Sequence, residues 1–311
     1  MSRHFRLGSW ARRRVVHAVD DVDLDIHSGE MLGIVGESGC GKSTLGRLLI
    51  GLDRPTGGRI TIDGAPLPTG VGPAFRRSRK QLQYVFQDPL SALNPRLTIG
   101  FQIEEVLRVH RLARQPATRA IALLDAVGLG PEHGERYVHQ LSGGQRQRAL
   151  VARTLAVEPG LVIFDEPVSA LDLSVQAQMI DLIAMLRRRL GLTGVFISHD
   201  LRVVRYVSDR IAVMYLGRIV EIGAADEVFH QPLHPYTQAL LGALLSLDPE
   251  RRRGPRRLLG DPPDPFEHPP GCSFHPRCPQ AAEVCRRTTP GLSRLADGRL
   301  AACHALPGPA A

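Results

Sequence analysis

The 311-residue sequence lacks an apolar run of the roughly 18 residues that a membrane-spanning helix requires. Residues 1–14 are basic and contain no apolar stretch of the kind found in a secretory signal peptide. We therefore expect a chain that stays in the cytosol and depends on other chains for any work at a membrane. A hydrophobic share of 43% still allows a large buried core with an appendage.

Lysine is scarce, because only Lys42 and Lys80 are lysines among the 39 lysine and arginine residues. The net charge is +8. Such an excess of positive charge suits an anionic partner, but it does not indicate whether that partner is a nucleotide, a nucleic acid or a lipid surface. In a chain so rich in arginine, a lysine at position 42 indicates a place where arginine is unsuitable.

Cysteine is also scarce, and its distribution is uneven. The chain has five cysteines, of which Cys40 stands alone and four lie near the C-terminus: Cys272, Cys278, Cys285 and Cys303. A cytosolic chain should not carry structural disulfides, so the cluster indicates metal. Four thiolates can hold a [4Fe–4S] cluster or Zn²⁺, and free thiols are the third alternative. The spacing matches neither paired zinc-finger cysteines nor the ferredoxin run.

Alternating patterns predict an α/β fold. Short, bounded apolar runs at 30–35, 161–164 and 194–198 are typical of central strands in a parallel sheet. Helical patterns follow at 42–51 and 173–190. Residues 210–222 predict two strands around a turn at Leu216-Gly217, and residues 98–157 show helical patterns without a clear strand. The whole indicates an α/β core with a helical subdomain.

Two segments differ in composition from their surroundings. Residues 70–80 indicate an exposed basic connector. Residues 248–270 are rich in proline and arginine, which disfavours helix and sheet and predicts a linker or extended arm. The arginines of this arm form either a solvated face or a contact with lipid headgroups or a membrane protein.

A phosphate-binding loop follows the strand predicted at 30–35. It consists of Gly36, Glu37, Ser38, Gly39, Cys40, Gly41, Lys42, Ser43 and Thr44. Its glycines let backbone N–H groups turn toward phosphate oxygens at a helix N-terminus, where Lys42 adds a cation and Ser43 a hydroxyl for Mg²⁺. Cys40 serves there as a small side chain, with redox sensing as the alternative. Alone, the motif fits kinases, GTPases and ATPases equally.

A second motif distinguishes among these classes of nucleotide-binding protein. It consists of Leu141, Ser142, Gly143, Gly144 and Gln145, at the start of a predicted helix. Here the chain resembles the ABC ATPase family, in which this signature segment contacts the γ-phosphate of ATP held by a partner subunit. The resemblance implies an active site that one copy cannot complete alone.

The same resemblance implies roles for residues that follow in order. Gln87 and Asp165 would join Ser43 in binding Mg²⁺, and Glu166 would orient the attacking water. His199 would contact the γ-phosphate, so that the catalytic set is Glu166, His199 and Lys42. The adenine-stacking residue is left unassigned, because Phe5 and Trp10 do not align with the family's position near residues 15–17.

Further segments resemble one subfamily, the ATPases of oligopeptide and dipeptide importers, and in particular the second of their two ATPases. These segments are residues 37–49, 85–96 and 232–237, within a resemblance that runs from about residue 15 to residue 304. It implies an ABC ATPase domain over 1–230, with a helical subdomain at about 90–157, and an importer-type C-terminal extension over 231–311. Some members are thought to bind an iron–sulfur cluster with such a cysteine tail.

The resulting expectation is an ATP- and Mg²⁺-dependent subunit that drives peptide import from the cytoplasmic face of the inner membrane. Its partners would be a second ABC ATPase, expected to be a paralogue, two integral-membrane permeases and, indirectly, an extracytoplasmic solute-binding protein. Import of nickel or another small solute is an alternative. A soluble ABC ATPase acting on nucleic acid is disfavoured, because the chain has neither tandem cassettes nor long coiled-coil arms.

Overall fold

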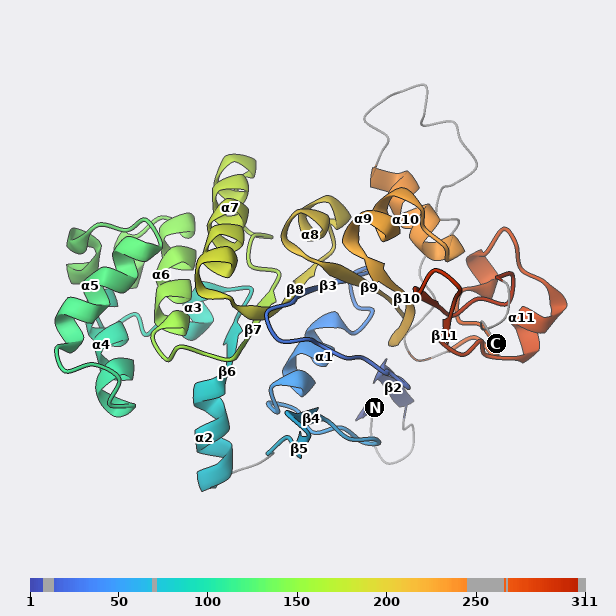
Figure 1. Ribbon diagram of the computed structural model, residues 1–311, viewed down its shortest axis with the longest axis horizontal. Helices are drawn as coiled ribbons and strands as arrows, with labels where there is room; N and C mark the ends of the chain where they lie inside the picture. The colour runs from blue at the N-terminus through green and yellow to red at the C-terminus, as the bar shows by residue number, and fades with distance from the viewer. Residues whose placement is uncertain (8–13, 69–71, 245–265, 267, 307–311) are drawn as a thin grey trace. The chain divides into compact units, whose positions relative to one another are not determined.

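The computed structural model describes residues 1–7, 14–68, 72–244, 266 and 268–306, and it divides into two compact units. The first comprises Met1–Ile26, Leu32–Leu67 and Ser198–Ala311, and the second comprises His27–Met31 and Pro68–Ile197. Both combine strands with helices, which confirms the α/β class (Figure 1). Among the described residues, no helix has both the length and the apolar character that crossing a bilayer demands.

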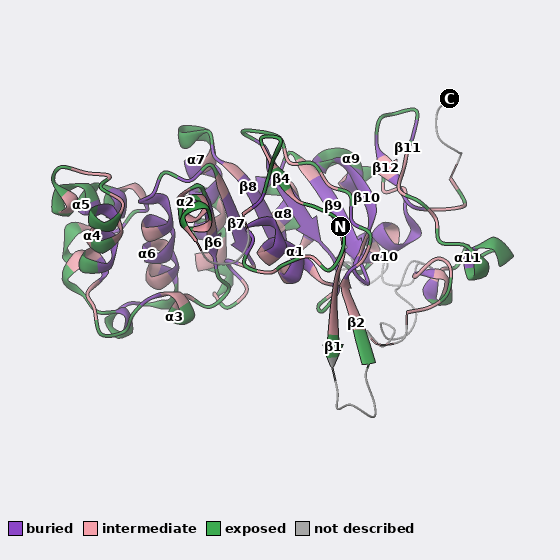
Figure 2. Ribbon diagram, turned by 90° about the horizontal axis from the view of Figure 1, so that it is seen from below, coloured by how far each residue is buried: buried purple, intermediate pink, exposed green. Residues whose placement is uncertain are grey.

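The sheet of the first unit has the strand order β11-β12-β10-β9-β3. Strand β3 (Met31–Val35) is buried throughout and runs parallel to β9 (Arg210–Tyr215). Figure 2 shows the ribbon of β9 in purple, the colour of buried residues. Strand β10 (Arg218–Ala224) returns antiparallel to β9. The turn between them has φ values of 43° at Leu216 and 80° at Gly217, as a tight hairpin of type I′ requires. The two strands expected over 210–222 are therefore confirmed.

Further short helices and two hairpins belong to this unit. The helices are α1 (Lys42–Leu49), α8 (Leu201–Val207), α9 (Ala225–His230) and α10 (Pro235–Leu244). The hairpins, which no sequence pattern had indicated, pair β1 (Arg3–Leu7) with β2 (Arg14–Val19) and β4 (Thr61–Ile62) with β5 (Ala65–Pro66). Helix α8 approaches β3 so closely that a Cβ at Gly33 would lie 2.1 Å from a methyl carbon of Val204.

The C-terminal segment joins the same sheet at its edge. Its elements are the 3₁₀-helix η4 (His275–Arg277), α11 (Glu283–Arg287), β11 (Ser293–Arg294) and β12 (Leu300–Ala301). Strand β12 pairs antiparallel with β10, placing Ala301 opposite Glu221, and β11 pairs with β12. Phe274 is 1% exposed, so this proline-rich segment is packed by apolar burial as well as by strand pairing.

The second unit holds three parallel strands, β6 (Leu82–Val85), β7 (Leu161–Asp165) and β8 (Thr193–Ser198), in the order β8-β7-β6. Helix α7 (Leu173–Leu190) has the expected bounds, because Asp172 caps its first turn and Gly191 adopts the left-handed conformation after its last. The region expected to be helical contains α3 (Pro89–Ala92), α4 (Ile99–Val109), α5 (Pro116–Ala126), η1 (Pro131–Glu135), η2 (Val138–Gln140) and α6 (Gly143–Leu155).

One sequence interpretation was wrong. Residues 70–80, interpreted as a connector, contain helix α2 (Pro73–Gln81). Proline is favourable in a first helical turn, and the alanine, arginine, lysine and glutamine that follow are good helix formers. The helix has no buried residue, so only the exposure was predicted correctly. The arm expected over 248–270 lies outside the described residues, apart from residues 266 and 268–270.

A buried histidine links α10 to β10. His234 is 1% exposed, and its Nδ1 accepts the backbone N–H of Tyr236 at 3.0 Å. The carboxylate of Glu221, which is 0% exposed, accepts the backbone N–H groups of Leu233 and His234. Burial lowers the pKa of His234 from 6.5 to about 4, because water no longer solvates the imidazolium.

This histidine predicts a pH-dependent stability. Between the two pKa values the unfolded chain binds a proton that the folded chain does not, so stability is complete above pH 6.5 and falls toward about pH 4. The expected loss from this group is about 3 kcal/mol. Urea unfolding from pH 7 to pH 4.5 measures it. His234→Asn, which keeps an acceptor for Tyr236, should show a correspondingly flatter profile, and an equal slope in both proteins would contradict the assignment.

Candidate functional site

The phosphate loop, residues 36–44, joins β3 to α1 in the first unit. Its lysine is folded back along the loop, since Lys42 Nζ donates to the carbonyls of Gly36 at 2.8 Å and Glu37 at 2.9 Å. Lys42 is only 5% exposed, so these two acceptors stabilise a buried ammonium. Helix α1 begins without a side-chain cap, as an anion-binding helix end does.

Glycine at position 41 fixes the loop against strand β2. Gly41 has a φ of 106°, and a Cβ there would lie 1.9 Å from the carbonyl oxygen of Ala18. The adjacent Cys40 is 5% exposed, and its carbonyl accepts the N–H of Gly217 at 2.9 Å. Burial raises the pKa of the Cys40 thiol despite the nearby Lys42, so the side chain stays neutral and serves as a small packing group.

His199 lies in the same unit, on the turn that precedes α8. Ser198 Oγ accepts the N–H of Asp200, and the Asp200 carboxylate accepts the N–H of Arg202 to cap the helix. These bonds fix the backbone on both sides of His199, whose side chain is exposed. The turn therefore leaves His199 accessible to solvent.

The second unit gathers another group at the carboxyl end of β7. Gln87 Nε2 lies 3.5 Å from Glu166 Oε2 and 3.2 Å from Ser169 Oγ. Glu166 has a φ of 45°, a left-handed conformation that is uncommon for a residue with a side chain. Strain of this kind persists where the surrounding structure imposes it, and it occurs most often at functional sites. Asp165 is 6% exposed, and its Oδ2 accepts the hydroxyl of Tyr84 at 2.6 Å.

The signature segment forms the N-terminus of α6. Ser142 Oγ accepts the N–H of Gln145 at 3.3 Å, and Gln145 Oε1 accepts the N–H of Ser142 at 3.0 Å, which together form a capping box. Ser142 and Gly143 are exposed, whereas Leu141 is 3% exposed and anchors the segment. A helix N-terminus with a hydroxyl thus faces outward, in a form suited to bind an anion.

The sequence-predicted residues are thus distributed over both units. The first holds Lys42 with its loop and His199, and the second holds Gln87, Asp165 and Glu166 with the signature segment. Sequence reasoning missed Tyr84 as a partner of Asp165, although it lies three residues before Gln87. For adenine stacking, Phe5 lies beneath the guanidinium of Arg3, 4.5 Å from the ring centroid, and Trp10 falls outside the described residues. No residue is assigned to adenine.

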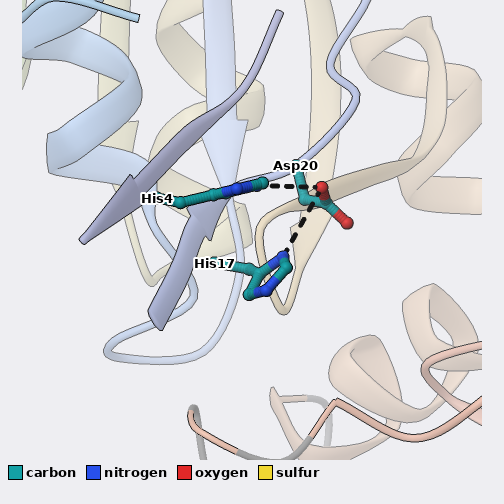
Figure 3. Close-up of side chains that lie close together, drawn as sticks. All are labelled: His4, His17 and Asp20. Carbon is teal, nitrogen blue, oxygen red and sulfur yellow. Dashed lines mark hydrogen bonds and ion pairs between the residues drawn. The ribbon is translucent and has the colours of Figure 1, made fainter. Parts of the chain in front are cut away.

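A separate cluster gathers around Asp20, as Figure 3 shows. His4 Nε2 and His17 Nδ1 lie 3.2 Å and 3.8 Å from Asp20 Oδ1. These three residues are the only group found in the described part of the chain whose side chains could together hold a metal ion. Arg218, however, donates twice to Asp20 Oδ2, at 2.7 Å and 3.0 Å. Burial alone would raise the pKa of Asp20, but Arg218 and His4 outweigh it and lower that pKa. We interpret the cluster as an ion-pair network that joins the β1–β2 hairpin to β10.

The four C-terminal cysteines lie near one another in the first unit. The N–H of Cys272 donates to the carbonyl of Cys285 at 2.8 Å. Burial, and then the three other thiols, raise the pKa of Cys272, and burial also raises the pKa values of Cys278 and Cys303. Among the described residues, no three of these sulfur atoms lie within 4.8 Å of one another.

Comparisons with known proteins agree with this geometry. The family model described as ABC transporter matches residues 19–169, and the one described as oligopeptide/dipeptide transporter, C-terminal region, matches residues 220–285. The chain is 45% identical over 310 residues to the dipeptide transport ATP-binding protein DppF of Escherichia coli, covering 98% of this chain and 92% of DppF. It is also 45% identical to the putative oligopeptide transport ATP-binding protein YkfD of Bacillus subtilis, covering 98% and 93%.

Solved structures give the same result for the cassette. The ATP-binding cassette MJ0796, in a dimeric post-hydrolysis state bound to ADP and Pi, has a TM-score of 0.64 at 29% identity, covering 72% of this chain and 96% of that one. CbiO1 from Clostridium perfringens, part of the ABC transporter complex cbiONQ, has a TM-score of 0.63 at 27% identity, covering 73% and 88%.

Proposed function

The chain belongs to the ABC transporter family, among the ATP-hydrolysing subunits of oligopeptide and dipeptide importers, and we propose that Lys42, Glu166 and His199 carry its ATP hydrolysis. The observation that carries the proposal is the group at the end of β7, where a glutamate in a left-handed conformation lies within reach of Gln87. A carboxylate held by its backbone in this way is suited to orient a water molecule.

Each remaining residue has a role suited to its chemistry. Lys42 neutralises charge on the β- and γ-phosphates, and the N-terminal N–H groups of α1 add to it. Ser43, Gln87 and Asp165 supply hydroxyl, amide and carboxylate oxygens, which are ligands that Mg²⁺ prefers, and the metal when bound offsets phosphate charge. Tyr84 orients Asp165 through its hydrogen bond. His199 contacts the γ-phosphate from its exposed turn.

The exposed signature segment acts on a second cassette. Its helix N-terminus and the Ser142 hydroxyl point outward, so they are available to the γ-phosphate of an ATP bound by the partner, which we take to be a paralogue. ATP then closes the two cassettes together, and hydrolysis releases them.

The permeases dock on the second unit near Gln87. Large apolar side chains are exposed in this unit, with Phe86 38% and Leu90 52% accessible close to Gln87 in the sequence, and Phe101 45% and Tyr137 39% accessible in the helical region. Apolar residues exposed in this way are typical of a surface that binds another protein. The chain therefore works as a peripheral subunit on the cytoplasmic face of the inner membrane, with peptides as cargo supplied by an extracytoplasmic binding protein.

The four cysteines bind an iron–sulfur cluster rather than zinc. Zinc–sulfur bonds of about 2.3 Å would place four tetrahedral ligands roughly 3.8 Å apart, whereas among the described residues no three of these sulfur atoms lie within 4.8 Å of one another. An iron–sulfur cluster, which is larger than a single ion, does not require three thiols to lie that close together. The raised thiol pKa values mean that binding must displace protons.

Substitution tests the catalytic assignment. Glu166→Gln should reduce ATP turnover by at least about 100-fold because the water loses its carboxylate, while ATP affinity stays near that of the parent. Glu158→Gln is the matched control, since Glu158 has a φ of 50° in the same unit but pairs with Arg119. Turnover and equilibrium ATP binding are measured together, and normal hydrolysis by Glu166→Gln would refute the role.

Isolation of the native complex tests the transport assignment. The tagged full-length chain, purified from its own cells in mild detergent, should bring two multi-spanning permeases and a second ABC ATPase, identified by mass spectrometry. Recovery with ribosomes or DNA-processing proteins alone would overturn the transport role and leave the ATPase chemistry intact.

Metal analysis tests the cysteine assignment. Full-length protein purified anaerobically should contain iron and acid-labile sulfide, and Cys285→Ser should lose both. Cys40→Ser, which changes the cysteine outside the cluster, should retain them. Stoichiometric zinc, or the absence of both metals, would contradict an iron–sulfur site.

A further inference from the structure

The C-terminal extension contacts the phosphate loop through Arg277 in η4. Its guanidinium forms a forked ion pair with Glu37, with Nη1–Oε2 at 2.8 Å and Nη2–Oε1 at 3.0 Å. The Arg277 side chain is 5% exposed and that of Glu37 is 21% exposed. Two parallel charge-assisted hydrogen bonds away from solvent hold a carboxylate far more firmly than a surface pair does.

A second anchor from the extension holds the backbone of the same residue. The N–H of Glu37 donates to the hydroxyl of Tyr236 at 2.9 Å, and Tyr236 is 0% exposed. Its ring packs against those of Tyr215 and Phe274, with centroids 4.6 Å and 5.5 Å away. The backbone N–H of Arg277 donates to the carbonyl of Phe274 at 3.0 Å. One aromatic cluster therefore positions both anchors.

Glu37 passes this constraint to the lysine of the loop. Its carbonyl accepts Lys42 Nζ at 2.9 Å, so side chain, N–H and carbonyl of Glu37 are all engaged. The contact also balances charge, because Glu37 places a carboxylate in the loop that binds a polyanion, and Arg277 neutralises it. Without the arginine, a partly buried carboxylate would remain unpaired next to the phosphates.

We propose that Arg277 is a positioning residue for ATP binding, which holds Glu37 and thereby Lys42 and cancels the Glu37 charge beside the triphosphate. The affinity for ATP thus depends on the folding of the thiol-bearing extension. The link is local, because Cys278 follows Arg277 directly and Cys272 lies five residues before it. The inference rests on the proposed function, since it assigns a residue to the same nucleotide site.

A double-substitution cycle on the full-length chain tests it, with the Kd for Mg-ATP as the readout. Arg277→Gln should weaken binding on the order of tenfold, a typical coupling between linked sites. Adding Glu37→Gln to that variant should restore most of the affinity, since it removes the unpaired charge. Arg277→Lys should fall between the parent and Arg277→Gln, because lysine keeps the charge but cannot form the fork.

Arg299→Gln is the matched control. Arg299 is an 8% exposed arginine of the same extension, and it binds Asp297 and the carbonyl of Gln231 instead of the loop. It should lower thermal stability without changing ATP affinity. If Arg277→Gln does not fold, the double variant and Arg277→Lys still allow the comparison.

Three outcomes separate the possibilities. Unchanged ATP affinity in Arg277→Gln, or equal affinity in the single and double variants, would overturn the proposal. When the parent binds ATP and Lys42→Ala does not, either of these two results contradicts this inference alone and leaves the proposed function standing. If the parent does not bind ATP, the proposed function itself is contradicted.

Discussion

A buried ammonium group needs acceptors, and the arrangement of the first unit follows from how Lys42 obtains them. The carbonyls of Gly36 and Glu37 turn toward its Nζ, which forces the loop into a tight curl at the end of β3. That curl brings Gly41 against Ala18 so closely that no side chain fits. The β2 strand, the β9–β10 hairpin and the aromatic cluster of the extension all contact this loop. A phosphate site of this kind is thus imposed by many neighbours at once, as preorganised electrostatics requires.

Local signals predicted the parts of the structure that depend on neighbouring residues in the sequence. Helix α7 was placed with its observed bounds because apolar residues recur at helical spacing from residue 173 to residue 190. Strands β3, β7, β8, β9 and β10 were evident from short apolar runs, whereas β6 was not predicted. Helix α2 was missed because its basic residues resemble a connector, although the same residues favour a helix. The β1–β2 hairpin was missed for a similar reason, since its strands hold basic residues and do not alternate cleanly.

The candidate-site residues that lie within short sequence motifs could be predicted from the sequence. The loop residues, the signature segment and Glu166 were all identified from short patterns. The partners that hold them were not, because they are distant in sequence or carry no motif. Tyr84 lies 81 residues from Asp165, and Arg277 lies 240 residues from Glu37. Tertiary contacts of this kind follow from the fold alone, and only the structure shows which distant side chains meet.

The forked pair between Glu37 and Arg277 also restricts how the gene can change. Its two members lie at opposite ends of the chain, one in the phosphate loop and one among the late cysteines, yet each leaves a buried or half-buried charge if the other is lost. A recombination event that joined this cassette to an extension without that arginine would produce a mismatched protein. Cassette and extension are therefore expected to be inherited as one piece, and a chimera built from two relatives must exchange both residues together.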